Sequence, residues 1–272
     1  MNVQLGINGA TIPSSDLLTG IHVARAAGFS LYEPRVPKLL EANTPEGRRA
    51  AQRALADEGL AWLPLNGLEN VFALPLDQIQ QAARDVCELA SGFGIRQVIA
   101  VPGAAGHDVS LSEAHDTIGT LKAIAASHEV EFLYEFIGFS HYAFPSLEQA
   151  REVASATTLL LVLDTFHLAV SGTTAETLQH MDAAEIGLIH LSDAIVGDRA
   201  ISTICDEDRV LPGEGRLPLQ DYLGVFAGIR FSGPVSVEVF HPKYESIGPG
   251  VGAREARARA SEALMSAGLD PN

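Results

Sequence analysis

Short, continuously apolar runs alternate with segments of helical periodicity along the whole chain. Runs of this kind, with no alternation of polar and apolar positions, are typical of strands that are buried on both faces of a parallel sheet. Each run leads into a helical segment. The predicted strands span 3–7, 30–33, 61–65, 97–101, 130–135, 159–164, 186–191 and 235–239.

The segments between these runs carry the spacing of amphipathic helices. Apolar residues recur at steps of three and four along 111–125 and again along 253–267, where arginines and glutamates fill the opposite face. Ser110 and Ser146 stand directly before two helical segments. A serine there can accept a hydrogen bond from a free backbone N–H of the first turn, so both are predicted to begin helices.

Eight strand-then-helix units in 272 residues predict a single (β/α)8 TIM barrel, an α/β fold that spans residues 1–272. A doubly wound open sheet is the alternative. That fold normally has a glycine-rich first turn, which GINGATIP (6–13) matches poorly. The connection 192–218 is far longer than a βα turn needs, and long βα loops of barrels lie over the active site.

Composition narrows the class of protein. The chain has 18 basic and 34 acidic residues, a net charge of −16, which disfavours a nucleic-acid partner. Cys87 and Cys205 suggest neither a disulfide framework nor a thiolate zinc site. No apolar run is long enough to span a membrane. A cytoplasmic protein without a membrane partner is expected, and a homo-oligomer is left open.

Four consecutive predicted strands end in residues that can ligate a metal: Glu135, Asp164, His190 and Glu238. The strands of a barrel all point the same way, so their last residues converge on one mouth. Three carboxylates and an imidazole are costly to gather in a mouth of low dielectric without a cation. We therefore predict one divalent metal ion; Mn2+, Mg2+, Co2+ and Zn2+ all suit these ligands.

Several motifs around these residues make the chain similar to a known family. VLDTFH (162–167), IHLSD (189–193), SVEVF (236–240) and DEDRVLPGEG (206–215) resemble the xylose isomerase-like superfamily, which contains sugar isomerases, epimerases and dehydratases. Within it the chain most resembles the inosose (2-keto-myo-inositol) isomerase group. The likeness extends to YEPR (32–35), PLNGL (64–68) and VIAVP (98–102), and so covers nearly the whole chain.

The resemblance implies roles for individual residues. Glu135, Asp164, His190 and Glu238 match the metal ligands of the family. His167 matches a histidine that faces the substrate, and Arg209 matches a basic residue of the long loop that binds substrate oxygens. His167 could instead orient a metal-bound carboxylate, and Arg209 could form a surface ion pair that closes the loop.

The chemistry expected of such a site is the movement of a carbonyl along a small hydroxy-carbonyl compound. A proton leaves the carbon next to the carbonyl, and a divalent metal stabilises the resulting enediolate. By analogy with epimerases of the superfamily that the chain resembles, Glu135 and Glu238 would flank the substrate and transfer the proton while also ligating the metal. His167 would contact a hydroxyl or the enolate oxygen, and the planar fork of Arg209 would hold another oxygen.

Other residues are weaker candidates for substrate binding. Glu33 and Arg35 could line the mouth, but a mutual ion pair at its rim is the favoured interpretation. His141 could reach the site, although an ordinary loop histidine is the simpler interpretation. The glycine-rich segment 247–252 could cradle a phosphate, but a flexible connector is favoured.

The chain departs from the resembling group at three positions. Gly9 stands where an acid is usual, and His241 and Lys243 stand where arginine and glutamate are more frequent. The end of the first strand and the segment after the last strand could both touch substrate, so the polyol handled could differ.

Three other functions remain open. A dehydratase acting on inosose or 3-dehydroshikimate would share the proton abstraction. An AP endonuclease IV-like DNA repair enzyme would need a trinuclear zinc cluster and a basic surface, which the net charge of −16 disfavours. A metal-binding sensor without activity is disfavoured by the presence of both Glu135 and Glu238.

Overall fold

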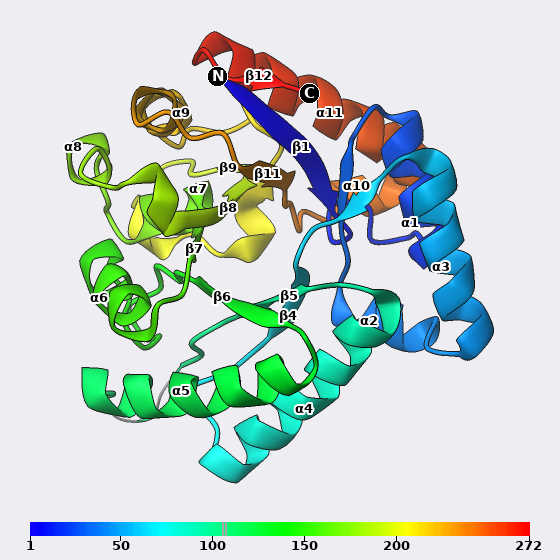
Figure 1. Cartoon of the computed structure of the whole chain (residues 1–272). Helices are drawn as coiled ribbons and strands as arrows, with labels where there is room; N and C mark the ends of the chain where they lie inside the picture. Colours follow the sequence, from blue (N-terminus) through cyan, green and yellow to red (C-terminus); the bar gives the residue numbers. More distant parts are fainter. Residues whose placement is uncertain (105, 107) are drawn as a thin grey trace.

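Nine parallel strands curl into one sheet in the computed structural model, which describes residues 1–104, 106 and 108–272 (Figure 1). The neighbours run in the order β3-β2-β1-β11-β8-β7-β6-β5-β4. A parallel bridge between Arg35, two residues after the end of β2, and Asn66 of β4 closes the sheet across the short strand β3. The predicted TIM-barrel fold is therefore confirmed. The strands are β1 (Asn2–Asn8), β2 (Leu31–Glu33), β3 (Ala61–Trp62), β4 (Leu65–Leu68), β5 (Gln97–Ala100), β6 (Glu131–Glu135), β7 (Leu161–Asp164), β8 (Ile186–Leu191) and β11 (Pro234–Val237).

The third predicted strand, 61–65, is wrong in one respect. It is divided into β3, which pairs with β2, and β4, which pairs with β5. Pro64 lies in the break and has no N–H to donate to a ladder, so one strand cannot run through it. The last strand also ends earlier than predicted, at Val237, although the N–H of Glu238 still donates to the carbonyl oxygen of Leu191.

Helices surround the sheet on its outer side (Figure 1). The predicted helical segments 111–125 and 253–267 fall largely in α5 and α11, and Ser110 and Ser146 each cap a helix through a capping box. Among the described residues, no helix has the length and apolar character that crossing a membrane requires. The helices are α1 (Leu17–Ala26), α2 (Val36–Glu41), α3 (Pro45–Glu58), α4 (Leu76–Phe93), α5 (Leu111–Ser127), α6 (Leu147–Thr157), α7 (Thr165–Val170), α8 (Ala175–Leu178), α9 (Leu219–Gly228), α10 (Lys243–Ser246) and α11 (Pro249–Ser266).

The barrel interior is filled by one layer of aliphatic side chains, contributed by successive strands of the sheet or the residues beside them. A larger apolar core lies between the strands and the helices. Gly6 on β1 leaves room for this inner layer, because a Cβ there would lie 2.6 Å from Leu63 Cδ1. The layer closes the barrel below the strand ends, so a cavity can form only above it. Its members are Leu31, Leu63, Ile99, Leu133, Val162 and Leu188.

The long connection 192–218 is structured. It contains an antiparallel ribbon of β9 (Asp193–Ala194) and β10 (Arg209–Val210). The buried carboxylate of Asp193 accepts hydrogen bonds from the backbone N–H groups of Gly213, Gly215 and Leu217. A side chain at Gly215 would overlap this carboxylate, so the close approach requires glycine. Asp193 thus ties together the two ends of the connection.

Residues 247 and 248 of the glycine-rich segment 247–252 lie between α10 and α11, and residues 249–252 form the first turn of α11. Gly248 adopts a left-handed φ of 77°, and α11 begins at Pro249 without a side-chain cap. The favoured interpretation of the whole segment as a flexible connector is therefore wrong, because most of it begins α11.

Candidate metal centre and active site

The four predicted ligands meet at the carboxyl ends of the strands. Glu135 and Asp164 are the last residues of β6 and β7, His190 is the penultimate residue of β8, and Glu238 follows β11. All four are buried, and one ligand atom from each lies within 4.8 Å of the others. This is the convergence that the barrel topology predicts.

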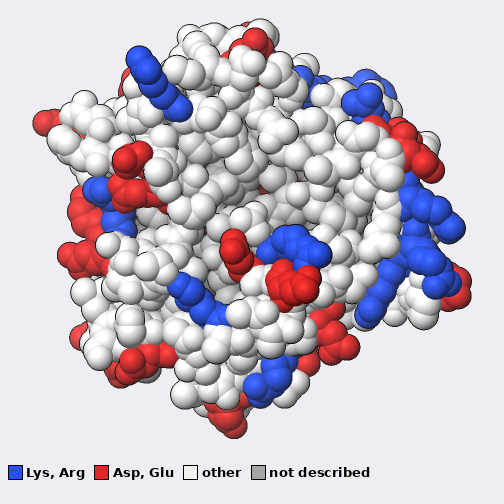
Figure 2. All heavy atoms as spheres, in the orientation of Figure 1, with Lys and Arg blue, Asp and Glu red and all other residues white. Residues whose placement is uncertain are grey.

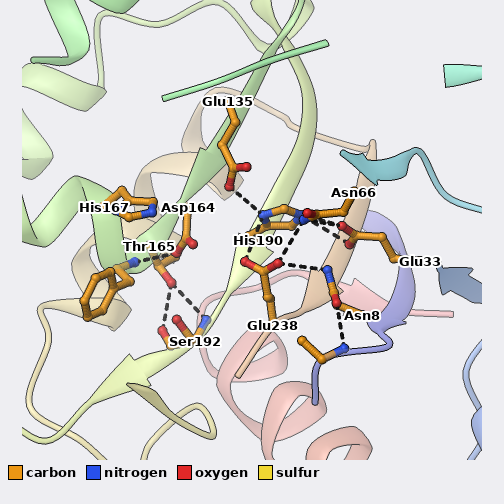
Figure 3. Close-up of polar contacts among 12 residues, drawn as sticks. Asn8, Glu33, Asn66, Glu135, Asp164, Thr165, His167, His190, Ser192 and Glu238 are labelled. Carbon is orange, nitrogen blue, oxygen red and sulfur yellow. Dashed lines mark hydrogen bonds and ion pairs between the residues drawn. The ribbon is translucent and has the colours of Figure 1, made fainter. Parts of the chain in front are cut away.

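His190 lies between carboxylates on both edges of its ring (Figure 3). Its Nδ1 is 3.0 Å from Glu135 Oε1 and 3.3 Å from Glu238 Oε2. Its Nε2 is 3.1 Å from both carboxylate oxygens of Glu33. Nδ1 therefore faces the candidate metal position, and Nε2 donates to Glu33, which fixes the orientation of the ring.

The favoured interpretation of Glu33 and Arg35 as a mutual ion pair is wrong. Glu33 is fully buried, because it lies two residues after the interior Leu31 and points to the same side of β2. Arg35 instead places Nη1 4.0 Å from Glu238 Oε1 and its guanidinium over the ring of Phe240. The two residues thus contact different ligands of the candidate metal centre.

Asn8 and Asn66 are site residues that the sequence analysis did not single out. Their Nδ2 groups both donate to Glu238 Oε1, at 2.8 and 3.0 Å. This leaves Glu238 Oε2 on the side of His190 (Figure 3). The signal was present in the sequence, since each asparagine is a polar residue that precedes a glycine at or near the end of an apolar run, at INGA and LNGL.

Arg209 is buried beside the candidate ligands. The alternative interpretation, in which it forms an ion pair at the surface, is therefore wrong. Nη1 donates to Asp164 Oδ2 at 2.5 Å, and Nε donates to Asp206 Oδ1 at 2.9 Å. The guanidinium also lies over the Phe166 ring, 4.2 Å from its centroid. Burial opposes ionisation of Asp164, but Arg209 holds the pKa of this carboxyl below its usual range.

His167 accepts a hydrogen bond from Arg209. The distance from Arg209 Nη2 to His167 Nε2 is 3.2 Å, and a guanidinium has donors only. Burial lowers the pKa of His167, which favours the neutral ring. The proton of that ring is then on Nδ1, which is buried and has no partner among the residues described. His167 therefore keeps a buried donor that the residues described do not use.

A cavity of about 340 Å³ opens over these residues. The predicted residues Glu135, Glu238, His167, Arg209 and Arg35 line it, together with the aromatic side chains of Phe139, Tyr142 and Phe240. His141 does not line it. This residue is exposed and stacks on Phe139, with ring centroids 5.8 Å apart.

The titratable groups of the candidate centre perturb one another strongly. Burial, and then the charge of Glu135, raise the pKa of Glu238 to about 8. Burial alone would lower the pKa of His190, but Glu238, Glu33 and Glu135 outweigh it and raise that pKa well above its ordinary value. Protons thus balance a cluster of buried carboxylates. A divalent cation among the same oxygens and Nδ1 would balance it instead, so the donor set fits a metal ion.

Charge on the molecular surface is mixed. Figure 2 shows lysines and arginines in separate groups among acidic side chains, around a central region of mostly uncharged residues. Such a surface offers no single broad basic face in this view, in keeping with a small-molecule site.

Replacing Glu33 by glutamine should weaken metal binding by about 10- to 100-fold, because Glu33 orients His190 without being a ligand itself. Metal affinity measured by competition with a chelator of known affinity tests this. The matched control is Glu69→Gln, which changes an exposed glutamate of the same cavity. Equal affinities of the two variants would show that Glu33 has no positioning role.

Comparisons with known proteins agree with this geometry. A family model described as xylose isomerase-like TIM barrel matches residues 21–265. An inosose isomerase of Bacillus subtilis is 32% identical over 168 residues, which is 59% of this chain and 60% of the relative. That alignment spans less than two thirds of the relative's length. An inosose isomerase of Halalkalibacterium halodurans is 27% identical over 245 residues, 86% of each chain.

The chain is also similar to a solved structure. A crystal structure of IOLI protein with a binding zinc atom superposes with a TM-score of 0.89 at 26% identity, and the match covers 97% of this chain and 99% of that one. The barrel and its strand ends are therefore shared over almost the whole length.

Proposed function

Because the chain belongs to the xylose isomerase-like TIM barrel family, we propose that it is a divalent-metal-dependent isomerase or epimerase of a small polyol or keto-sugar resembling inosose. The relatives support an enzyme that acts as a sugar isomerase or epimerase. The observation that carries the metal dependence is the buried set of three carboxylates and one imidazole within 4.8 Å of one another. The zinc reported in the similar IOLI structure agrees with it.

Glu135, Asp164, His190 and Glu238 would hold the ion through one atom each. A divalent metal supplies Lewis-acid stabilisation of the negative charge that develops on the substrate oxygens when a proton leaves the adjacent carbon. Mn2+, Mg2+, Co2+ and Zn2+ are all compatible with this donor set.

The proton transfers fall to Glu135 and Glu238. They come from β6 and β11, which β7 and β8 separate in the sheet, so they reach the cavity from two sides. Glu135 Oε1 contacts His190, while for Oε2 the described part of the chain provides no hydrogen-bond donor. One carboxylate can take a proton from a carbon beside the carbonyl, and the other can return a proton to a neighbouring carbon.

His167 and Arg209 would bind the substrate oxygens. His167 lines the cavity, and its ring would contact a hydroxyl or the enolate oxygen. Arg209 holds His167 and Asp164 in place and borders the same cavity. Both groups are already ordered before any ligand enters, which lowers the entropy lost on binding.

The test is to incubate the metal-loaded protein with inosose in deuterated buffer and to follow the products by NMR. We expect an isomer of unchanged composition with deuterium at a carbon next to the carbonyl, and no conversion after treatment with a chelator. Loss of water from the product would instead identify a dehydratase. Nicking of DNA by the zinc-loaded protein would identify a repair endonuclease.

A further inference from the structure

We propose that a second cavity beside the candidate metal centre is a subsite for an anionic group of the substrate, a carboxylate or a phosphate. The proposal rests on the proposed function. This cavity has a volume of about 310 Å³ and lies among the segments that follow β1, β2 and β11. It is lined by Gly9, Ala10, Pro13, Arg35, Pro37, Lys38, Phe240, His241 and Pro242.

The second cavity adjoins the first. Arg35 and Phe240 line both of them, and the guanidinium of Arg35 lies over the Phe240 ring, 5.3 Å from its centroid. Arg35 is also 4.0 Å from Glu238, one of the candidate metal ligands. A substrate whose carbonyl end lies at Glu238 can therefore extend past this pair of side chains into the second cavity.

The lining is basic in an acidic protein. It contains an arginine, a lysine and a histidine but no aspartate or glutamate, although the chain has 34 acidic and 18 basic residues. Three of the lining residues are prolines, which have no backbone N–H. The polar contacts to a ligand in this cavity would therefore come mainly from the basic side chains, which favour a ligand with negative charge.

Arg35 has donors to offer. Its guanidinium carries five N–H groups, and none of them makes a hydrogen bond to the part of the chain that the structure describes. Its contact with Glu238, at 4.0 Å, is too long for one. A planar fork of this kind matches the paired oxygens of a carboxylate or a phosphate.

Lys38 is held in place by its surroundings. Its Nζ donates to the carbonyl oxygen of Ile12 and to Ser15 Oγ, both at 3.0 Å, which leaves one N–H for a ligand. Burial lowers the pKa of Lys38 to about 8, so a nearby anion would favour its charged form. Gly9 lies beside it, since a Cβ at Gly9 would be in van der Waals contact with Lys38 Cδ, at 3.6 Å.

His241 completes the set. Its Nδ1 accepts a hydrogen bond from the backbone N–H of Lys243, at 3.2 Å. In the neutral ring the proton is then on Nε2, where it can be donated to a ligand. Lys243 itself pairs with Glu214 at 2.7 Å and does not line the cavity.

The test measures binding to the metal-loaded protein by calorimetry, with D-fructose, D-fructuronate and D-fructose 6-phosphate as probes. We expect at least one of the two acidic probes to bind about tenfold or more tightly than D-fructose, as charge-assisted hydrogen bonds require. Tighter binding of D-fructuronate would indicate a carboxylate subsite, and tighter binding of D-fructose 6-phosphate a phosphate subsite. Equal affinities for all three probes would overturn the proposal.

Variants locate the effect. In Lys38→Met the preference for the acidic probe should fall by about tenfold while the affinity for D-fructose stays the same, and Lys38→Arg should restore part of it. The matched control is Lys122→Met, since Lys122 also makes two hydrogen bonds, to Thr157 and Thr158, but lies outside both cavities. A preference that survives in Lys38→Met would place the anion elsewhere.

Competition supplies a result that does not depend on the folding of a variant. Inorganic phosphate should weaken binding of the acidic probe and leave that of D-fructose unchanged; equal effects on both probes would contradict the subsite. Binding is also separate from turnover. Selective binding without any isomerisation would overturn the proposed function alone, and isomerisation without selectivity would overturn the subsite alone.

Discussion

The Glu238→Gln variant should purify without stoichiometric metal and lose at least about a thousandfold in kcat/KM, because one residue serves as both ligand and proton carrier. Glu238 Oε1 accepts hydrogen bonds from Asn8 and Asn66. A glutamine would turn its carbonyl oxygen to those two donors. Its NH2 group would then face His190 Nδ1, where the carboxylate oxygen Oε2 stands now. An amide nitrogen in that position binds no metal and takes no proton.

Elemental analysis and steady-state kinetics of the variant measure both effects. Glu69→Gln is again the control, because it removes a negative charge from the rim of the same cavity and should leave metal content and rate nearly unchanged. If Glu238→Gln retains one metal ion per chain and wild-type activity, the proposed centre is wrong.

Replacing Arg209 with methionine should lower the free energy of unfolding of the metal-free protein by about 3 kcal/mol, the usual cost of breaking a buried ion pair by removal of one partner. Asp164 would be left buried without the cation that now contacts it at 2.5 Å. His167 and Asp206 would lose their partner as well. A metal ion at Asp164 would supply the missing positive charge, so the loss should be smaller in the metal-loaded protein.

Urea denaturation with chelator and with saturating metal separates these two states. Arg199→Met is the matched control, because Arg199 belongs to the same connection but pairs with Asp208 at the surface. Its removal should change the unfolding free energy little. A loss of the same size in both variants, or one that metal does not reduce, would contradict a role of Arg209 in balancing Asp164.

The four candidate ligands could be predicted because strand polarity alone brings them together. Glu135 and Asp164 end strands whose apolar pattern is plain, and parallel strands deliver their last residues to one edge. To predict that Glu33 lies at the site, one must also know which face of β2 points into the barrel. The interior place of Leu31, two residues earlier, directs Glu33 into the barrel, but sequence alone does not say which face of β2 is interior.

Arg209 shows where sequence reasoning fails. The string DEDR is typical of a solvated surface, and three acidic neighbours suggest local ion pairs. Its burial depends on the pairing of β10 with β9 and on Asp164, which lies 45 residues earlier. Similarly, Asn66 reaches Glu238 across 172 positions of the chain. Contacts of this length depend on how the barrel closes, which local patterns do not encode.

Asp193 affects how the protein meets its ligand. By tying Gly213, Gly215 and Leu217 to the start of the connection, it makes a segment of 27 residues part of the scaffold. A polyol is strongly hydrated and gains little from each hydroxyl that exchanges water for protein. Such a weak ligand cannot also order a long disordered segment. The fixed connection therefore lets a small, hydrophilic ligand bind with useful affinity, because the protein surface that recognises the ligand is formed before the ligand binds.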